Sequence, residues 1–593
     1  MAYYRLSIVD YFIFFSFLLL SVGVGIYHAI ADKFKKKSAD RCKTEEYLMG
    51  GRKMPIIPVT LSLLTTFLSG ITLLGTPAEV FDHGPLWCVH YLTGPLGFFI
   101  TGFYLLPVLY RLNTTSIYEY LELRFHSVLL RRLCAGLFIL NTLIYAGVTI
   151  YAPALALNEV VNLDVWFLIL LVGTCSTIYT TIGGLKAVVW ADTLQAGVMY
   201  AGLFAIIYKG MVFVFYRRVA AVGGVGQVFE TLSESGRWET SIRWGLDPAQ
   251  YVSVWIILFS SAALNLSQYA VNQMAAQRYC SLPTLKDAQK SLFLIAPLYL
   301  IISLLACFMS FVIFAYFYNC NPLETGEISA YDQLAVLFAI KVSDGIPGLV
   351  GVFLACIFAW SLSTVSSGYN SIAAVIYNDF VLPHSEHRLT PKKSLWLNKI
   401  VVLISGILST AIAFSAGPLG GIVRSAVGLL GATIGPVLGV FCLGIFNRRV
   451  SSKAVIIGFT LTLGVCVFLW TFSVLENPYK GHHLPTNSSQ ENCGAKDYKK
   501  MYISTDYDTH FGRPDTSYFS RISPFAYALI GPSFTYFFGV LLSCIFKPEA
   551  EKYSSGRKYS LTFRGRIPKP FLDNDDVKRS MIIVNKESSE DLL

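Results

Sequence analysis

Long apolar runs separated by short polar segments are the dominant pattern of this chain. Thirteen runs are long enough to cross a bilayer, since about 20 apolar residues in a helix span its hydrocarbon core. They fall at 8–30, 54–78, 86–110, 130–157, 164–182, 188–215, 251–275, 290–318, 347–377, 397–416, 419–446, 453–474 and 523–546. The pattern predicts an all-α polytopic membrane protein with about 13 transmembrane helices.

The runs predict one transmembrane domain over residues 1–546, followed by a charged tail at 547–593. The first run lacks a short cationic leader and a small-residue cleavage site, so we expect it to be a span rather than a signal peptide. The tail has no apolar periodicity, which predicts a disordered cytoplasmic segment. A long polar segment at 475–522 predicts an extracellular loop.

Loop charges predict the orientation of the chain, because cytoplasmic loops carry an excess of Lys and Arg. The segment "DKFKKKSADRCK" after the first run is strongly basic, whereas "NEVVNLD" and "NCNPLETGEISAYD" are acidic or neutral. This alternation places the N-terminus outside and the C-terminus in the cytoplasm. Arg217 and Arg218 oppose the rule, because the same order of spans places them outside. The further basic loops lie at 131–133, 387–393 and 447–453.

Composition supports the membrane class. The chain is 54% hydrophobic and 14% charged, against about 25% charged residues in soluble domains. We assign the net charge of +10 to membrane topology, so lipid is expected around the protein and nucleic acid is not expected as a partner. No His/Asp/Ser cluster and no cluster with metal-ligand spacing lies in a span, which argues against an enzyme. The sequence also lacks a repeated filter segment, which argues against an ion channel.

The predicted outer loops carry two candidate modifications. Asn487 begins the sequence Asn-Ser-Ser, a glycosylation acceptor in an accessible loop. Cys320 and Cys493 lie in polar loops and could form a disulfide if both face outside. The sequence leaves this pairing open.

The run 54–78 contains polar residues that a lipid-facing helix does not need. Thr66 and Ser69 stand three apart and share a face, Gly70 weakens the helix, and Pro77 removes a backbone donor. A helix unwound here would expose carbonyl oxygens that suit a hard cation such as sodium. A helix interface built from small residues is the alternative, and this run alone does not decide between them.

Two further spans add polar groups. The stretch "AWSLSTVSSGYNS" places neighbouring hydroxyls at Ser363 and Thr364, where they can converge on one ion. Asp192 and Gln195 are three apart on one face near the predicted cytoplasmic end of their span. The acid either assists sodium release or simply reaches water.

Several segments together carry a family resemblance: "LMGGRKMP", "FLSGITLLGTPAEVF", "IYAPALALN", "YTTIGGLKAVVWADTLQ", "VNQMAAQRY", "GEISAYDQL" and "FLACIFAWSLSTVSSGYNSIAAV". Over roughly residues 5–475 the chain resembles the solute:sodium symporter family, in the branch of the sodium-coupled monocarboxylate, sodium-dependent multivitamin and sodium/iodide transporters. The resemblance implies the leucine-transporter-type 5+5 inverted repeat, with its core at 54–446. It also implies broken helices at 54–78 and 251–275, with the substrate between them.

The same resemblance implies roles for individual residues. Sodium would bind at the hydroxyls of Ser363 and Thr364, with main-chain carbonyls near Thr66 and Ser69, and with Asp192 and Gln195 on its pathway. Gln273 matches a further polar position of that pathway. The substrate candidates are Phe67, Thr72, Tyr145, Asn265, Gln273, Val423, Arg424 and Val427.

Departures from the family bear on the substrate. The iodide transporters have Gln where this chain has Thr72 and Trp where it has Asn265, which makes iodide doubtful. Arg424 stands where relatives are expected to have Gln, and its guanidinium suits a carboxylate. It either pairs with an organic anion, faces the outer vestibule or pairs with a protein acid.

We therefore predict a sodium-coupled symporter that imports a small organic anion, either a monocarboxylate or a carboxylate vitamin, across the plasma membrane by alternating access. An inorganic anion such as iodide, or a transport-inactive sensor of sodium and solute, is the alternative function. A monomer suffices for this fold, and a weak homodimer stays possible.

Overall fold

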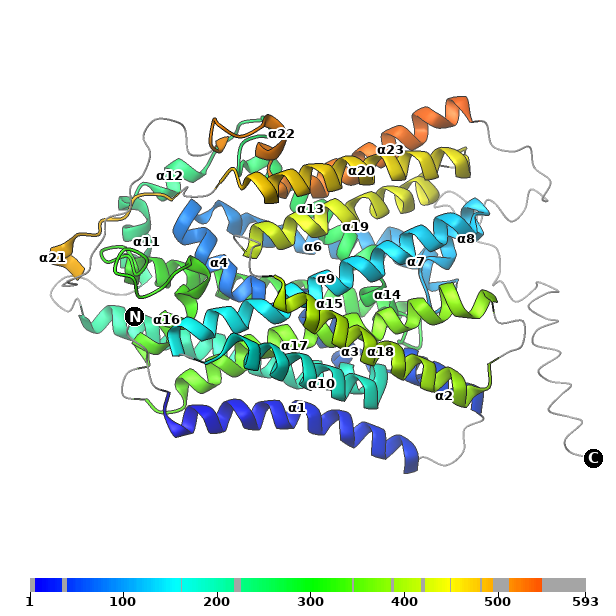
Figure 1. Cartoon of the computed structure of the whole chain (residues 1–593), viewed down its shortest axis with the longest axis horizontal. Coiled ribbons are helices and arrows are strands. Elements are labelled where there is room, and N and C mark those ends of the chain that lie inside the picture. The colour runs from blue at the N-terminus through cyan, green and yellow to red at the C-terminus, as the bar shows by residue number, and fades with distance from the viewer. Residues whose placement is uncertain are drawn as a thin grey trace, which may run out of the picture.

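The computed structural model describes residues 6–546 apart from the gaps at 35–39, 113, 162, 218–224, 344–345, 385–388, 417–421, 448, 480–482 and 494–510. The predictions for the tail at 547–593 lie outside the described residues. Within them the regular structure is entirely helical, as the apolar runs predict. Figure 1 shows the helices running side by side along the long axis of the molecule.

The spanning helices follow the predicted runs closely. Ten helices are long and apolar enough to cross a membrane, or twelve if each of two bent pairs counts as one span, among the described residues. The long helices are α1 (Ile8–Phe34), α9 (Val128–Val161), α10 (Val165–Arg217), α15 (Leu285–Phe317), α17 (Leu349–Val375), α18 (Pro391–Phe414), α19 (Ile422–Phe446), α20 (Ser452–Glu476) and α23 (Tyr527–Ile545). A tenth candidate span, Pro85–Tyr110, contains α5 (Val89–Leu92), α6 (Gly94–Ile100) and α7 (Leu106–Tyr110).

The boundary between two of the thirteen predicted spans is a kink rather than a loop. The runs 164–182 and 188–215 both belong to α10, and non-helical Gly184 divides α10 into two helices between them. Gly184 has φ 59° and ψ −155° and kinks the helical run, a conformation that only glycine adopts at low cost. A straight helix of this length would far exceed the bilayer thickness, so the kink takes the place of the expected loop.

Two bent pairs interrupt the bundle. The first joins α3 (Ile56–Phe67) to α4 (Gly70–His83) at 48°, and the second joins α13 (Val254–Ala270) to α14 (Gln273–Tyr279) at 52°. These are the two runs that the family resemblance expects to be broken. In the second break, the Asn272 side chain accepts a hydrogen bond from the backbone N–H of Met274 at 2.9 Å, which caps α14.

Short helices lie at the two ends of the bundle. In Figure 1 the start of α1 lies at the same end as α16 and α21, whereas α2 and α8 lie at the opposite end. The bounds of the short helices are α2 (Asp40–Met49), α8 (Glu119–Phe125), α11 (Val225–Glu234), α12 (Arg237–Ser241), α16 (Leu334–Val342), α21 (Gln490–Cys493) and α22 (Tyr518–Arg521).

The described residues 477–479 and 483–493 of the loop after α20 form a strap that covers the C-terminal end of α4. A disulfide joins Cys320 to Cys493, with their Cα atoms 5.1 Å apart, which settles the pairing that the sequence left open. His483 Nδ1 lies 2.5 Å from Asp82 Oδ1. Arg237 donates to the carbonyls of Phe81 at 2.8 Å and Pro485 at 2.8 Å. Burial lowers the pKa of Arg237 to about 10, so it stays charged at neutral pH and ties the strap to α4.

Candidate functional site

The break between α3 and α4 lies at the centre of the candidate site. Leu68 (φ −88°, ψ 96°) and Ser69 (φ −95°, ψ 168°) are extended, so the last carbonyls of α3 have no helical partners one turn further on. Gly70 begins α4, and an added Cβ there would lie 2.5 Å from Ser361 Oγ. Glycine therefore lets α4 approach α17 closely at the point where the helix is interrupted.

Hydroxyl groups of α3 and α17 face one another beside this break. Ser363 Oγ donates to Thr65 Oγ1 at 2.7 Å, and Thr66 Oγ1 lies 3.3 Å from Ser367 Oγ. Thr364 Oγ1 donates to the carbonyl of Trp360 at 3.2 Å, within its own helix. The Ser363 hydroxyl therefore contacts α3 near the break, whereas the hydrogen bond of Thr364 stays within α17.

A buried ion pair lies next to these hydroxyls. Asp192 Oδ2 accepts from Ser62 Oγ at 2.5 Å and from Arg278 at 3.3 Å, and both charged side chains are fully buried. Arg278 also donates to Ser62 Oγ at 2.7 Å and to the Ser367 hydroxyl. This network links α3, α10, α14 and α17. Arg278 is a residue that sequence reasoning missed, although the quoted motif "VNQMAAQRY" contains it.

Several buried oxygens in this region lack protein partners. Among the described residues, Asp192 Oδ1, Ser361 Oγ and both polar atoms of Gln195 are buried without a hydrogen bond. Buried polar groups are normally paired, because an unpaired one costs about 1–3 kcal/mol. Carboxylate, amide, hydroxyl and carbonyl oxygens are the ligands that hard cations prefer, so this donor set fits sodium.

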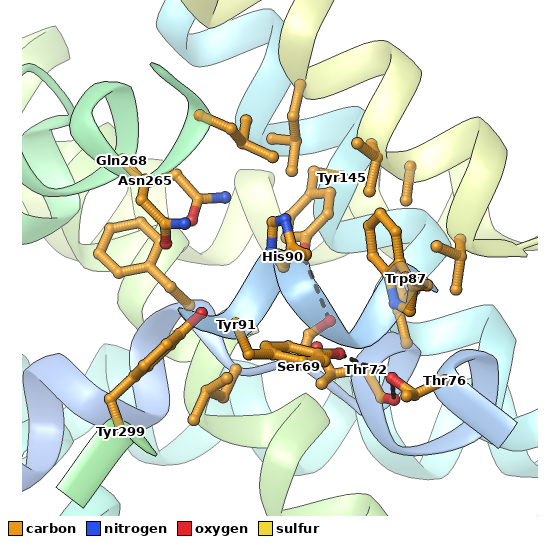
Figure 2. Close-up of a pocket in the computed structure, with 18 of the residues that line it drawn as sticks. Ser69, Thr72, Thr76, Trp87, His90, Tyr91, Tyr145, Asn265, Gln268 and Tyr299 are labelled. Atoms are coloured by element: carbon orange, nitrogen blue, oxygen red, sulfur yellow. Dashed lines mark hydrogen bonds between the residues drawn. The ribbon is translucent and has the colours of Figure 1, made fainter. Parts of the chain in front are cut away.

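A cavity of about 570 Å³, part of it open toward solvent, adjoins the break. Figure 2 shows its polar side chains, with Ser69 and Thr72 from the broken helix and Asn265 and Gln268 from α13. Tyr145 on α9 donates to Ser69 Oγ at 3.2 Å. The lining residues are Phe67, Leu68, Ser69, Ile71, Thr72, Thr76, Trp87, His90, Tyr91, Tyr145, Leu264, Asn265, Gln268, Tyr269, Tyr299, Val423, Ala426, Val427 and Leu430.

The lining contains histidine but no Lys, Arg, Asp or Glu among the residues that the structure describes. Six of the eight predicted substrate residues line this cavity. They are Phe67, Thr72, Tyr145, Asn265, Val423 and Val427. Ser69, predicted for sodium, lines it as well, so one hydroxyl lies at both the break and the cavity.

Two predicted substrate residues lie outside the cavity. Gln273 accepts from the backbone N–H of Ile117 at 3.0 Å and donates to the carbonyl of Thr115 at 2.6 Å, so its amide is occupied in holding the segment before α8. Arg424 donates to Asn477 Oδ1 at 2.5 Å, and its guanidinium lies 5.9 Å from the centre of the Tyr479 ring. It therefore lies beside the strap rather than in the cavity.

The cavity also contains residues that sequence reasoning missed. His90 is a single polar residue in an apolar run, a pattern that usually indicates a satisfied core histidine. Gln268 follows Asn265 by three residues, so the helical spacing alone puts it on the same face. That spacing was the available signal for Gln268, and no comparable signal marks His90.

Beyond the cavity, a polar cluster closes the C-terminal end of α4. Glu79 accepts from the Tyr251 hydroxyl at 3.1 Å, and the His83 ring stacks on that of Tyr251 at 4.3 Å. Burial raises the pKa of Tyr251 well above its usual range, so the phenol keeps its proton and donates.

The predicted glycosylation site, Asn487, is exposed on the strap.

Comparisons with known proteins agree with this arrangement. A model of the sodium:solute symporter family matches residues 47–461, and the chain belongs to that family. The protein is accordingly a multi-pass membrane transporter, a sodium-coupled symporter and not an enzyme, as the sequence predicts.

Curated relatives fall in the predicted branch. Sodium-coupled monocarboxylate transporter 2 of Bos taurus is 37% identical over 461 residues, covering 78% of this chain and 72% of the relative. Sodium-dependent multivitamin transporter of Oryctolagus cuniculus is 36% identical over 470 residues, covering 78% and 70%. Sodium-coupled monocarboxylate transporter 1 of Homo sapiens is 32% identical over 581 residues, covering 96% and 91%.

A solved structure supports the fold. The substrate-bound, outward-open state of a Na⁺-coupled sialic acid symporter matches with a TM-score of 0.71 at 23% identity, over 91% of this chain and 99% of that one. The leucine-transporter-type fold predicted from the sequence is confirmed by this match.

Proposed function

We propose that this symporter imports a small organic anion, a monocarboxylate or a carboxylate vitamin, together with sodium. The names of its relatives support this substrate class. One structural observation carries the proposal, namely that the break of the helix adjoins both regions. Ser69 lines the cavity, and the next residue, Gly70, approaches the Ser361 hydroxyl of α17 so closely that an added Cβ would lie 2.5 Å from it. Sodium and substrate then bind on two sides of one interruption.

The geometry offers the anion two sources of positive potential. Helix α4 begins at the cavity. Its N-cap is Ser69, whose side chain accepts no hydrogen bond from the first N–H groups of the helix, and unpaired N–H groups at a helix start favour an anion. The other source is the sodium ion held at the break. We propose that Ser363 and Thr364 bind this ion with carbonyls near Thr66 and Ser69, and that Asp192 and Gln195 bind an ion or guide its release.

The direction of transport follows from an orientation that we also propose. Disulfides persist in oxidising compartments, so the end that carries Cys320–Cys493 faces outside. Asp10 accepts from the backbone N–H groups of Gly348 and Gly351 at 3.0 and 2.9 Å, and in Figure 1 the start of α1 lies at the end with α21. The N-terminus is then outside, the basic loops are cytoplasmic, and the plasma membrane is the expected location.

Tracer uptake tests the function. Cells that express the chain receive labelled carboxylates in sodium medium and in medium with choline in place of sodium. We expect saturable accumulation that requires sodium. Specific binding of the same compounds without accumulation would instead favour a sensor, and uptake of iodide but of no carboxylate would favour an inorganic-anion transporter.

A glycosylation assay tests the orientation. In animal cells the parent chain should shift in mass on treatment with a glycosidase, and the Asn487→Gln variant should not. A parent chain that carries no glycan at Asn487 would remove that support for an external strap.

A further inference from the structure

Three polar side chains form a second hydrogen-bonding surface in the cavity, apart from Ser69 and Tyr145. Asn265 and Gln268 project from one face of α13, and His90 comes from α5 (Figure 2). The His90 ring stacks in parallel on Trp87, with centroids 4.7 Å apart and planes 8° apart. This stacking fixes the plane of the imidazole at the cavity wall.

The hydrogen bonds within this surface leave specific atoms unused. Asn265 Nδ2 donates to Thr93 Oγ1 at 3.2 Å and to the carbonyl of Ser261 at 2.9 Å, which occupies the amide nitrogen and leaves Oδ1 as an acceptor. His90 Nδ1 lies 2.8 Å from Ser261 Oγ, which leaves Nε2 as the ring nitrogen that this contact does not use in a residue that lines the cavity. Gln268 makes no hydrogen bond to any residue that the structure describes.

This pattern bears on what the substrate must carry. This part of the cavity wall therefore offers the Oδ1 acceptor of Asn265, a ring nitrogen of His90, and both a hydrogen-bond donor and an acceptor in the amide of Gln268. An alkyl chain placed there would displace water and leave these groups unpaired, which costs about 1–3 kcal/mol for each buried group. A site built to hydrogen-bond a substrate group strongly rejects the analogue that lacks it.

We propose that His90, Asn265 and Gln268 select an organic anion that carries a second, uncharged hydrogen-bonding group, such as a hydroxyl, an amide or a ureido group. This inference rests on the proposed function, since it takes the carboxylate to lie at the broken helix. Plain alkyl carboxylates are then poor substrates, and the three residues determine specificity rather than sodium coupling.

Isosteric competitors test the proposal. A labelled carboxylate that shows sodium-dependent uptake serves as the reporter, and 4-carbamoylbutanoate and 5-methylhexanoate compete against it. The two differ only in a terminal amide against an isopropyl group. We expect the amide to inhibit at a concentration at least about tenfold lower, since each satisfied hydrogen bond contributes roughly that factor.

Variants assign the preference to the residues. Asn265→Leu and Gln268→Met remove the polar groups at similar volume, and His90→Phe keeps a ring to stack on Trp87. Each should reduce the competitor ratio toward one while the half-saturating sodium concentration stays within about twofold. Gln289→Leu is the matched control, because this half-buried glutamine donates to the carbonyl of Gly102 at 2.9 Å and does not line the cavity.

The outcomes separate the two levels of inference. Sodium-dependent carboxylate uptake with equal inhibition by both competitors overturns the second-group proposal and leaves the proposed function standing. A preference that survives all three substitutions removes the assignment to these residues. If no carboxylate gives sodium-dependent uptake, the proposed function fails and this inference fails with it.

Discussion

At the scale of residues, the sequence predicted oxygen donors better than charged partners. Clustered hydroxyls such as Ser363 stand out in an apolar run because a spanning helix does not need them. The partner of Asp192 was not predictable in this way, since Arg278 lies 86 positions away and only the tertiary structure brings the two together. Arg424 had a plausible substrate role by chemistry alone, and packing against Tyr479 gives it a different place.

Replacing Ser363 with Ala should weaken sodium binding. The change removes one oxygen from the proposed site, and we expect the half-saturating sodium concentration for uptake to rise roughly tenfold. Ser291→Ala is the control. Ser291 on α15 is a buried serine whose hydroxyl accepts from Thr60 of α3 at 3.1 Å, and it is not one of the proposed sodium ligands. Equal sodium dependence in both variants would remove Ser363 from the site.

Replacing Asp192 with Asn should destabilise the protein. Removing one partner of a buried pair leaves Arg278 without its counter-charge, a change that typically costs about 3–5 kcal/mol. We expect a clearly lower midpoint of thermal unfolding for the purified variant. In the double variant Asp192→Asn/Arg278→Met the uncompensated charge is gone, so much of the loss should be recovered. Additive losses from the two substitutions would show that the pair is not coupled.

At the scale of elements, interruptions in apolar runs were predictable where glycine and hydroxyls coincide, and their geometry was not. Gly70 and Ser69 mark the break in the first pair, and the structure bends it by 48°. The boundary between the runs 164–182 and 188–215 was predictable as well, but Gly184 forms it as a kink and not as a loop. A glycine with positive φ inside a helical run is fixed by its neighbours, here Tyr47, whose backbone oxygen would lie 2.6 Å from an added Cβ.

Close packing of α4 on α19 depends on a second glycine. A Cβ added at Gly75 would lie 1.9 Å from Val423 Cγ2, so Gly75→Ala should separate the two helices, with an overpacking cost of about 1–3 kcal/mol. We expect strongly reduced uptake, measured against the amount of protein at the cell surface. The control is Gly464→Ala in α20, where an added Cβ meets nothing within 4 Å.

A second substitution identifies the cause. Val423→Ala removes the atom that Gly75→Ala would strike, so the double variant should regain uptake for the same amount of protein at the cell surface. Unchanged uptake by Gly75→Ala alone would show that the spacing of α4 and α19 does not limit transport.

At the scale of the whole molecule, the number of ions decides how far the solute can be concentrated. A tenfold sodium gradient supplies about 1.4 kcal/mol per ion, and a potential of roughly 60 mV supplies about another 1.4 kcal/mol per charge. With one sodium, the potential acting on the cation cancels its action on a monovalent anion, leaving about tenfold accumulation. With two, the surplus is about 4 kcal/mol, or roughly a thousandfold.

We predict two sodium ions for each monovalent anion, because oxygens without partners occur both at the break and around Asp192 and Gln195. Each cycle then moves one net positive charge inward. Substrate added to voltage-clamped cells should evoke an inward current that disappears when choline replaces sodium. Sodium-dependent uptake with no current at any holding potential would indicate a single ion.

The absence of Lys, Arg, Asp and Glu from the described lining of the cavity has a consequence for inhibitors. An anion that enters this space meets no fixed countercharge, so the alkali metal is its neutralising partner and occupancy by either one favours the other. A neutral mimic of the same shape, such as a primary amide in place of the carboxylate, has no charge to neutralise, so its binding does not require bound sodium. Such an amide should bind the sodium-free transporter in choline medium. It should therefore inhibit a state of the transporter that the anionic substrate does not bind.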